Sequence, residues 1–320
     1  MEGALTPGAR ASVWGRRPAR AALYGALLCA ACGRGPAPVA TSPAPAPTPP
    51  AARGAGLELP WAEVLEAAPD PAVVADPELR SRLSATGLPW RVRDRRSGIE
   101  LLLVPTGTFS RGAAPDDAEA TDDERPAHAV VVVEPFYLGR YEVTQGEWQR
   151  VLGDNPSFFT GESGRASGEL GPPVEQVALF RVHEFLAETE LRLPTESQWE
   201  AACRAGDPRP RYGALDEIAW HRGNAHGMPH AVGGRAANAL GFHDLLGNVW
   251  EWTASGFMAE EYARHRTPLD ARAAVLGAAK AVLRGGSWYD PPKRARASAR
   301  YSVERDFVGG HVGFRVMRVP

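Results

Sequence analysis

Cysteine is scarce in this sequence, with three residues among 320. Cys29 and Cys32 lie together near the N-terminus, so Cys203 is the one cysteine in the rest of the chain. A single cysteine cannot form an intramolecular disulfide, and the folded part must therefore be stabilised by its core. Residues 199–203 (WEAAC) have an apolar helical pattern, which predicts that Cys203 is a small buried thiol rather than a catalytic one.

The apolar stretch near the N-terminus is too short to span a bilayer. Residues 21–31 (AALYGALLCAA) fall well below the roughly 20 residues that a membrane-spanning helix needs. A basic lead, a short apolar region and small residues at its end are typical of a secretory signal. We therefore predict a signal peptide over residues 1–31 that is removed on export. The basic lead consists of Arg10, Arg16, Arg17 and Arg20.

A strong charge of either sign is also missing, because the formal net charge is −2. Acidic and basic residues are interspersed, so the charge of the surface would attract neither nucleic acid nor an anionic membrane. We expect no nucleic-acid partner.

The segment after the signal predicts a membrane tether. Residues 30–32 (AAC) resemble the end of a bacterial lipobox, in which the cysteine is lipidated and becomes the first mature residue. Ordinary cleavage without a lipid is the alternative. Residues 32–58 are rich in proline and alanine, a composition that cannot bury enough apolar surface to fold and favours extended polyproline chain. We predict lipidation of Cys32 and a semi-rigid tether that holds a folded domain away from the membrane.

These features predict where the protein resides. Gly33, and no aspartate retention signal, follows the lipidated cysteine. We therefore expect an exported, lipid-anchored protein at the outer membrane or periplasmic face of a bacterium rather than in the cytoplasm.

Two further segments precede the middle of the chain. Residues 59–89 carry apolar residues at roughly helical spacing, interrupted by prolines, which predicts a short helical lead-in. From residue 90 the sequence pattern changes from helical spacing to short apolar runs. Residues 99–105 (IELLLVP) and 129–133 (AVVVV) are short and apolar, which predicts buried strands. The acidic run between them, 116–125, is expected to be solvated.

Helices are indicated next. Thr144 and Glu147 have the spacing of a capping box, as do Thr195 and Gln198, so each pair predicts a helix start. Residues 177–186 (VALFRVHEFL) have one apolar face, which predicts a third helix. Beyond residue 208 glycine and tryptophan dominate without regular periodicity, which indicates a loop-rich half with short strands. The fold class is therefore α+β, with one globular domain over residues 90–320.

Five segments in order resemble the formylglycine-generating enzyme family, also called sulfatase-modifying factors. The resemblance implies a C-type-lectin-like fold. It covers essentially the whole folded domain. The segments are 137–148 (YLGRYEVTQGEW), 192–199 (RLPTESQW), 246–253 (LGNVWEWT), 283–288 (LRGGSW) and 312–316 (VGFRV).

The same resemblance argues against the family's best-known reaction. Its catalytic members hold copper between two cysteines that follow the RGGSW block, and oxidise a substrate cysteine to formylglycine. Asp290 and Ala295 occupy the matching positions, and neither is the soft thiolate that copper(I) prefers. The resemblance therefore implies no catalytic residues and makes copper an unexpected cofactor.

The resemblance also implies a calcium site. The matching ligands are the side chains of Asp244 and Glu251 with the carbonyls of Gly247 and Val249. Oxygen donors of this kind suit calcium, with water completing the shell. The alternative is that Asp244 caps a turn and Glu251 pairs with an arginine.

Other catalytic interpretations have weaker support. Ser287 lies outside any nucleophile elbow and is expected to be a turn hydroxyl. Iron-dependent relatives that make sulfoxides use histidines of an additional helical domain, for which this chain has no room. The histidines here lack metal-site spacing; they are His221, His226, His230, His243 and His311.

Two functions follow as hypotheses. The first is a membrane-tethered, non-catalytic module that binds an envelope protein or glycan through the vacated active site. A largely cationic groove for carboxylates or phosphates would be lined by Ser287, Asp290, Lys293, Arg294, Arg296 and Arg300. Arg296 and Arg300 could instead stabilise the fold. The second is a formylglycine-generating oxidase, or another oxidoreductase acting on protein cysteine.

Overall fold

The structure, a computed structural model, describes residues 59–160, 170–265 and 268–320. The described residues all belong to one compact unit. The predicted signal peptide (1–31), Cys32 and the tether (32–58) lie outside the described residues.

The largest sheet has five antiparallel strands in the order β1-β2-β3-β6-β12. The predicted strand at 99–105 is its central strand β3, which is paired along both edges and is buried almost throughout. The strands are β1 (Ala62–Glu66), β2 (Arg91–Asp94), β3 (Glu100–Val104), β6 (Phe136–Gly139) and β12 (Met317–Arg318).

The lead-in is only partly helical, so the prediction for residues 59–89 was half wrong. Its first part forms β1, in which Val64 pairs with Val92 of β2. Trp61 packs edge-on against Tyr137 with ring centroids 5.5 Å apart. Pairing with the edge of the sheet has overridden the helical spacing, although Val64 remains 50% exposed in the strand. The second part is helix α1 (Pro77–Ala85), which Asp76 caps.

Two smaller sheets complete the β-structure. One has four strands in the order β10-β9-β7-β11, and the other has three in the order β4-β5-β8. The predicted strand at 129–133 is β5. The strands are β10 (Arg300–Glu304), β9 (Lys280–Arg284), β7 (Trp250–Gly256), β11 (Val312–Phe314), β4 (Gly107–Arg111), β5 (His128–Val132) and β8 (Leu269–Asp270).

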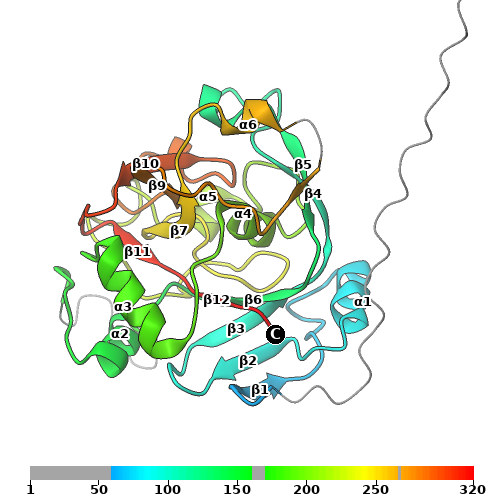
Figure 1. The fold of residues 1–320 in the computed structure, drawn as a ribbon, viewed down its shortest axis with the longest axis vertical. Helices are drawn as coiled ribbons and strands as arrows, with labels where there is room; N and C mark the ends of the chain where they lie inside the picture. Colours follow the sequence, from blue (N-terminus) through cyan, green and yellow to red (C-terminus); the bar gives the residue numbers. More distant parts are fainter. Residues whose placement is uncertain (1–58, 161–169, 266–267) are drawn as a thin grey trace, which may run out of the picture. The chain divides into compact units, whose positions relative to one another are not determined.

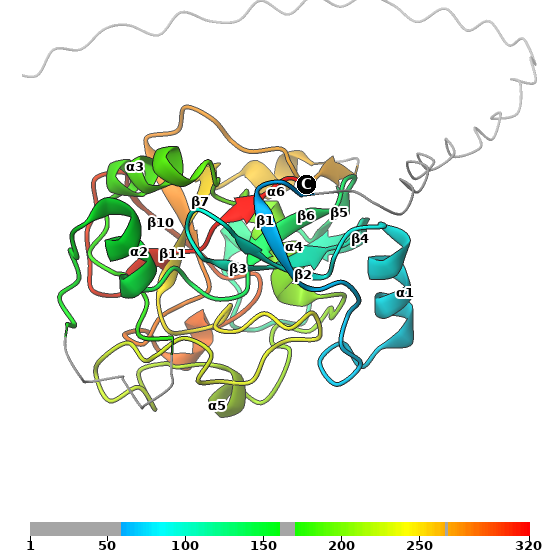
Figure 2. The same ribbon diagram turned by 90° about the horizontal axis from the view of Figure 1, so that it is seen from below.

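The predicted helices are present. Capping boxes begin α2 at Thr144 and α4 at Thr195, as the sequence predicts. α2 and α3 lie side by side (Figure 2), with Trp148 stacked on Phe185 at 5.5 Å. The helices are α2 (Gln145–Leu152), α3 (Leu179–Thr189), α4 (Glu196–Arg204), α5 (Leu215–Ile218) and α6 (Glu261–Arg264), with 3-10 turns η1 (Asp122–Glu124) and η2 (Pro292–Arg294).

Helix α4 lies among the strands of both smaller sheets (Figure 1). It contacts β4 and β5 on one side and β7 and β9 on another, and every residue in it is buried. A helix in this position is expected to be apolar, yet α4 carries Glu196, Glu200 and Arg204. Buried charges are costly unless they are paired, so each needs an ionic partner.

Arginines from three strands meet the α4 carboxylates. Glu196 accepts from Arg111 at 2.6 Å and from Arg300 at 2.7 Å. Glu200 pairs with Arg284 of β9 and with Arg204 one turn along the helix at 2.8 Å. Burial alone would raise the pKa of Glu196, but the charges of Arg300, Arg111 and Arg284 outweigh it and hold the pKa at about 2. This ionic cluster joins α4 to both smaller sheets.

The loop-rich half is held by tryptophans, as the sequence indicates. Indole N–H groups of Trp252 and Trp288 donate to the carbonyls of Val177 (2.9 Å) and Gly310 (2.8 Å). A buried indole needs such a partner, and loop carbonyls provide it.

Replacing Glu196 by glutamine should destabilise the domain strongly. The substitution leaves buried arginine charge without its carboxylate, and breaking a buried pair costs about 3–5 kcal/mol. The free energy of unfolding in urea measures the loss. Arg96→Ala is the matched control, because it removes an exposed pair with Glu190 and should cost about 0–1 kcal/mol. Equal losses in the two variants would contradict the role given to the cluster.

Candidate functional site

The RGGSW block forms a tight turn at the end of β9. Gly286 has a φ of +82°, and a Cβ there would lie 2.9 Å from the carbonyl oxygen of Arg294. Only glycine allows residues 286 and 294 to approach this closely. The turn therefore lies directly against Arg294 and Ala295, at the end of the segment that holds the two vacated cysteine positions.

Asp290 is a hydrogen-bond acceptor within the turn. Its Oδ2 accepts from the indole of Trp250 at 2.7 Å and from the hydroxyl of Ser287. Ser287 is buried and also accepts from the backbone N–H of Tyr289 at 3.3 Å. The prediction that Ser287 is a turn hydroxyl is confirmed, and Asp290 links the turn to β7.

Ala295 has no group that could bind a metal or a substrate. Its side chain is 2% exposed and belongs to the hydrophobic core. Its backbone closes the loop, with its N–H donating to Pro292 and its carbonyl accepting from Arg211 at 2.9 Å. The second cysteine position is therefore a core position in this chain.

Cys203 is the buried thiol that the sequence predicts. It is fully buried in α4, and burial raises its pKa to about 12. A fully buried thiol with a raised pKa is a poor nucleophile near neutral pH.

Three of the histidines serve the local structure. His221 pairs with Asp216 at 2.8 Å, while His230 and His243 each contact a backbone carbonyl. Within the described ranges, no group of three or more His, Cys, Asp or Glu residues could hold a metal ion.

Arg296 and Arg300 do not form an open cationic groove, and the structure corrects that expectation. Arg296 is buried and donates to Glu124 at 2.7 Å and to Asp117 at 3.0 Å. Arg300 is buried against Glu196 and Glu261. Both arginines stabilise the fold, which was the alternative for each.

The acidic run at 116–125 is not simply solvated, and that expectation was wrong for two of its members. Glu124 is completely buried and Asp117 nearly so, because both face Arg296. Burial would raise the pKa of Glu124, but the hydrogen bonds and charge of Arg296 lower it to about 2. The composition of the run gave no sign of this distant partner.

A surface depression of about 430 Å³ lies where the acidic run meets β10 and η2. It adjoins the vacated cysteine position, because Trp250, which binds Asp290, packs on Tyr301 at 5.4 Å. We call it the Arg294 depression, and it is lined by Thr121, Asp122, Asp123, Phe257, Ala259, Arg294, Arg300, Tyr301 and Ser302.

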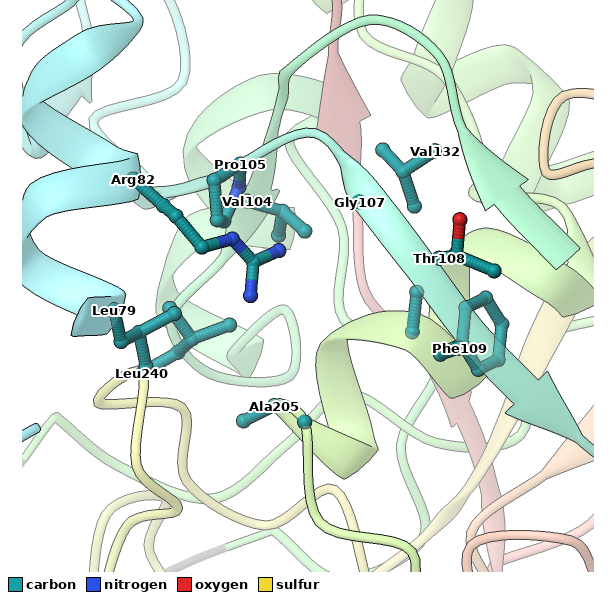
Figure 3. Close-up of a pocket in the computed structure, with 12 residues that line it drawn as sticks. Leu79, Arg82, Val104, Pro105, Gly107, Thr108, Phe109, Val132, Ala205 and Leu240 are labelled. Carbon is teal, nitrogen blue, oxygen red and sulfur yellow. The ribbon is translucent and has the colours of Figure 1, made fainter. Parts of the chain in front are cut away.

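A second cavity lies between α1, the β3–β4 turn and the end of α4 (Figure 3). The side chain of Arg82 reaches into it and donates to the carbonyl of Thr106 at 2.7 Å. Its volume of about 50 Å³ is far below the roughly 300 Å³ at which ligand sites begin. It is a packing defect rather than a ligand site.

The two carboxylates predicted to bind calcium, Glu251 and Asp244, differ in their surroundings. Glu251 is bidentate to Arg315 at 2.7 Å and also accepts from the indole of Trp199 at 2.6 Å, so both of its oxygens are engaged. Asp244 sits in a turn with its Oδ2 accepting from Gly233, whereas its buried Oδ1 has no partner among the described residues. Burial raises the pKa of Asp244 to about 6. The arginine alternative therefore describes Glu251, and calcium at Asp244 stays a prediction.

One buried carboxyl beside this loop was missed from the sequence. Glu142 accepts from the Val249 backbone at 3.0 Å and from Asn248 at 2.6 Å. Burial, with Asp244 and Glu251 nearby, raises its pKa well above the usual value. Its position in the YEVTQGEW segment, which resembles the family, was the feature of the sequence that could have pointed to it.

The chain matches known proteins over the region just described. Residues 91–320 match the sulfatase-modifying factor enzyme 1-like domain. The chain belongs to this family. It is 34% identical over 234 residues to hercynine oxygenase of Mycobacterium tuberculosis, covering 58% of this chain and 53% of that protein. It therefore spans about half the length of that relative.

Two further matches cover nearly the whole length of the matched protein. Formylglycine-generating enzyme of Streptomyces coelicolor is 27% identical over 312 residues, covering 78% of this chain and 95% of that one. The structure of PvdO from Pseudomonas aeruginosa has a TM-score of 0.62 and 25% identity, covering 72% and 98%. These matches confirm the C-type-lectin-like α+β fold of the family.

Proposed function

We propose that this sulfatase-modifying-factor-like chain is a non-catalytic binding module, exported and tethered to a bacterial membrane. One observation carries the non-catalytic part. Both positions that match the copper cysteines have structural roles, since Asp290 ties the turn to Trp250 and Ala295 fills the core. The remaining thiol, Cys203, is buried with a raised pKa.

The tether part of the proposal has support from the sequence. A basic lead, a short apolar stretch, the AAC site and a proline-rich segment follow one another before the folded domain. In the part of the chain that the structure describes, no helix has the length and apolarity to cross a membrane. The ligand would be an envelope protein or glycan that meets the face beside Asp290.

An oxidase that acts on protein cysteine is the second candidate, because the relatives include a protein named formylglycine-generating enzyme. Such a reaction would need a redox centre at Asp290 and Ala295, where one hard carboxylate and one methyl group are available. The residues present therefore do not fit copper(I).

Incubation of the chain with copper and a cysteine-containing peptide should leave the peptide without an aldehyde. The reason is the missing thiolate pair, and mass spectrometry of the peptide is the measurement. The Streptomyces coelicolor formylglycine-generating enzyme is the positive control under the same conditions. Aldehyde formation by this chain would overturn the non-catalytic proposal.

Cys32→Ser should move the protein from the membrane fraction to the soluble periplasmic fraction, since it removes the lipid attachment atom. Cys29→Ser is the matched control and should leave the protein in the membrane fraction. Immunoblots of the fractions measure the distribution. Wild-type protein in the soluble fraction would instead support ordinary signal cleavage without a lipid.

We also propose calcium binding at Asp244 with the carbonyls of Gly247 and Val249. The support is the unpartnered Oδ1 and the surplus of buried carboxyl groups around Arg315. Millimolar calcium should raise Tm by a few degrees, because a ligand that binds only the folded state stabilises it. Asp244→Asn should abolish this rise, while Asp207→Asn at an unrelated turn should not. If neither calcium nor a chelator changes the Tm of the wild-type protein, the proposal is wrong.

A further inference from the structure

The Arg294 depression has the size of a ligand site. Its volume of about 430 Å³ lies in the range of roughly 300–1,000 Å³ that small-molecule sites occupy. It is a surface feature built from parts of the chain far apart in sequence, namely the end of the acidic run, the segment after β7, and β10.

Two aromatic rings in the depression are held in place from behind. Tyr301 is 37% exposed and packs on Trp250 with ring centroids 5.4 Å apart. Phe257 packs against the guanidinium of Arg300 at 5.0 Å. Braced rings offer apolar contact area to a ligand without losing much freedom on binding. The carbon–hydrogen face of a sugar ring is a matching surface.

The polar lining is suited to hydroxyl groups. A sugar hydroxyl both donates and accepts hydrogen bonds. Asp122 and Asp123 are acceptors, Arg294 is a donor, and the hydroxyls of Tyr301 and Ser302 can be either. A ligand with several hydroxyl groups can therefore find partners of both kinds around the rings.

The charge of the lining disfavours anions. Arg300 is already neutralised by Glu196 and Glu261, which leaves Arg294 opposite two aspartates among the described lining residues. A phosphate or carboxylate would meet like charge, which costs several kcal/mol at an interface. The lining of the Arg294 depression is therefore mildly acidic.

The acidic wall is fixed before any ligand arrives. Thr121 donates to the carboxylate of Asp123 at 2.6 Å, and Arg300 donates to the Asp123 carbonyl at 2.9 Å. Glu124, the next residue, is anchored by Arg296. A preformed wall lowers the entropy cost of binding. We propose that the Arg294 depression binds an oligosaccharide without acidic groups, an inference that rests on the proposed function as a binding module.

Isothermal titration calorimetry on the full chain tests this proposal. The protein is held in lauryldimethylamine oxide, a detergent without a sugar headgroup, and titrated with chitotetraose, maltotetraose and a glucosamine tetramer. We expect saturable binding of at least one of them. Tyr301→Ala and Asp122→Asn should each weaken it about tenfold, the effect of losing one good contact or charged hydrogen bond.

Phe180→Ala is the matched control, because it removes a 58% exposed ring from α3 and should bind like the wild type. Wild-type protein that binds none of the three sugars would overturn the proposal, as would binding that Tyr301→Ala and Asp122→Asn leave unchanged. Binding of inorganic phosphate without any sugar would also overturn it. A failure here with no aldehyde in the copper assay removes only the sugar assignment, whereas aldehyde formation removes the proposed function itself.

Discussion

The pairing of the α4 carboxylates with arginines from the surrounding strands is the interaction on which the rest of the domain depends. Glu196 and Glu200 lie on a helix that is buried on all sides, and their partners come from β4, β9 and β10. The ionic contacts connect both sheets to α4, and buried tryptophans such as Trp199 and Trp252 pack in the same core.

This arrangement explains why the family segments are recognisable in a chain that has lost the family's cysteines. RLPTESQW supplies Glu196 and Trp199, LRGGSW supplies Arg284, LGNVWEWT supplies Glu251, and VGFRV supplies Arg315. The contacts between them are buried, as in the pair of Glu251 with Arg315 and the indole of Trp199. The segments therefore supply residues that stabilise the fold. They report common ancestry, whereas Asp290 and Ala295, which match the copper cysteines, lie outside the five segments.

The features predicted from the sequence are those with a local cause. A capping box needs four consecutive residues, so Thr144 and Thr195 could be identified as helix starts. Strand β3 was visible as a short apolar run. The partners of Arg296 and Arg300 were not predictable, because Glu124 and Glu196 lie 172 and 104 residues away. For the same reason the acidic run was expected to be solvated. Strand β1 was not predicted because it forms by pairing with β2, which local sequence does not reveal.

The contact of Gly286 with the carbonyl of Arg294 has a consequence for how this domain can change. The loop between the two residues is closed at its base by backbone atoms, and it carries Tyr289 and Lys293, which are exposed. Neither side chain belongs to the closure or to the ionic cluster at α4, so replacements at these two positions should leave both intact. The loop can therefore accept new side chains, and new ligand preferences, at little expense in folding. A loop that is closed by backbone atoms and carries exposed side chains is a natural place at which to graft binding sequences.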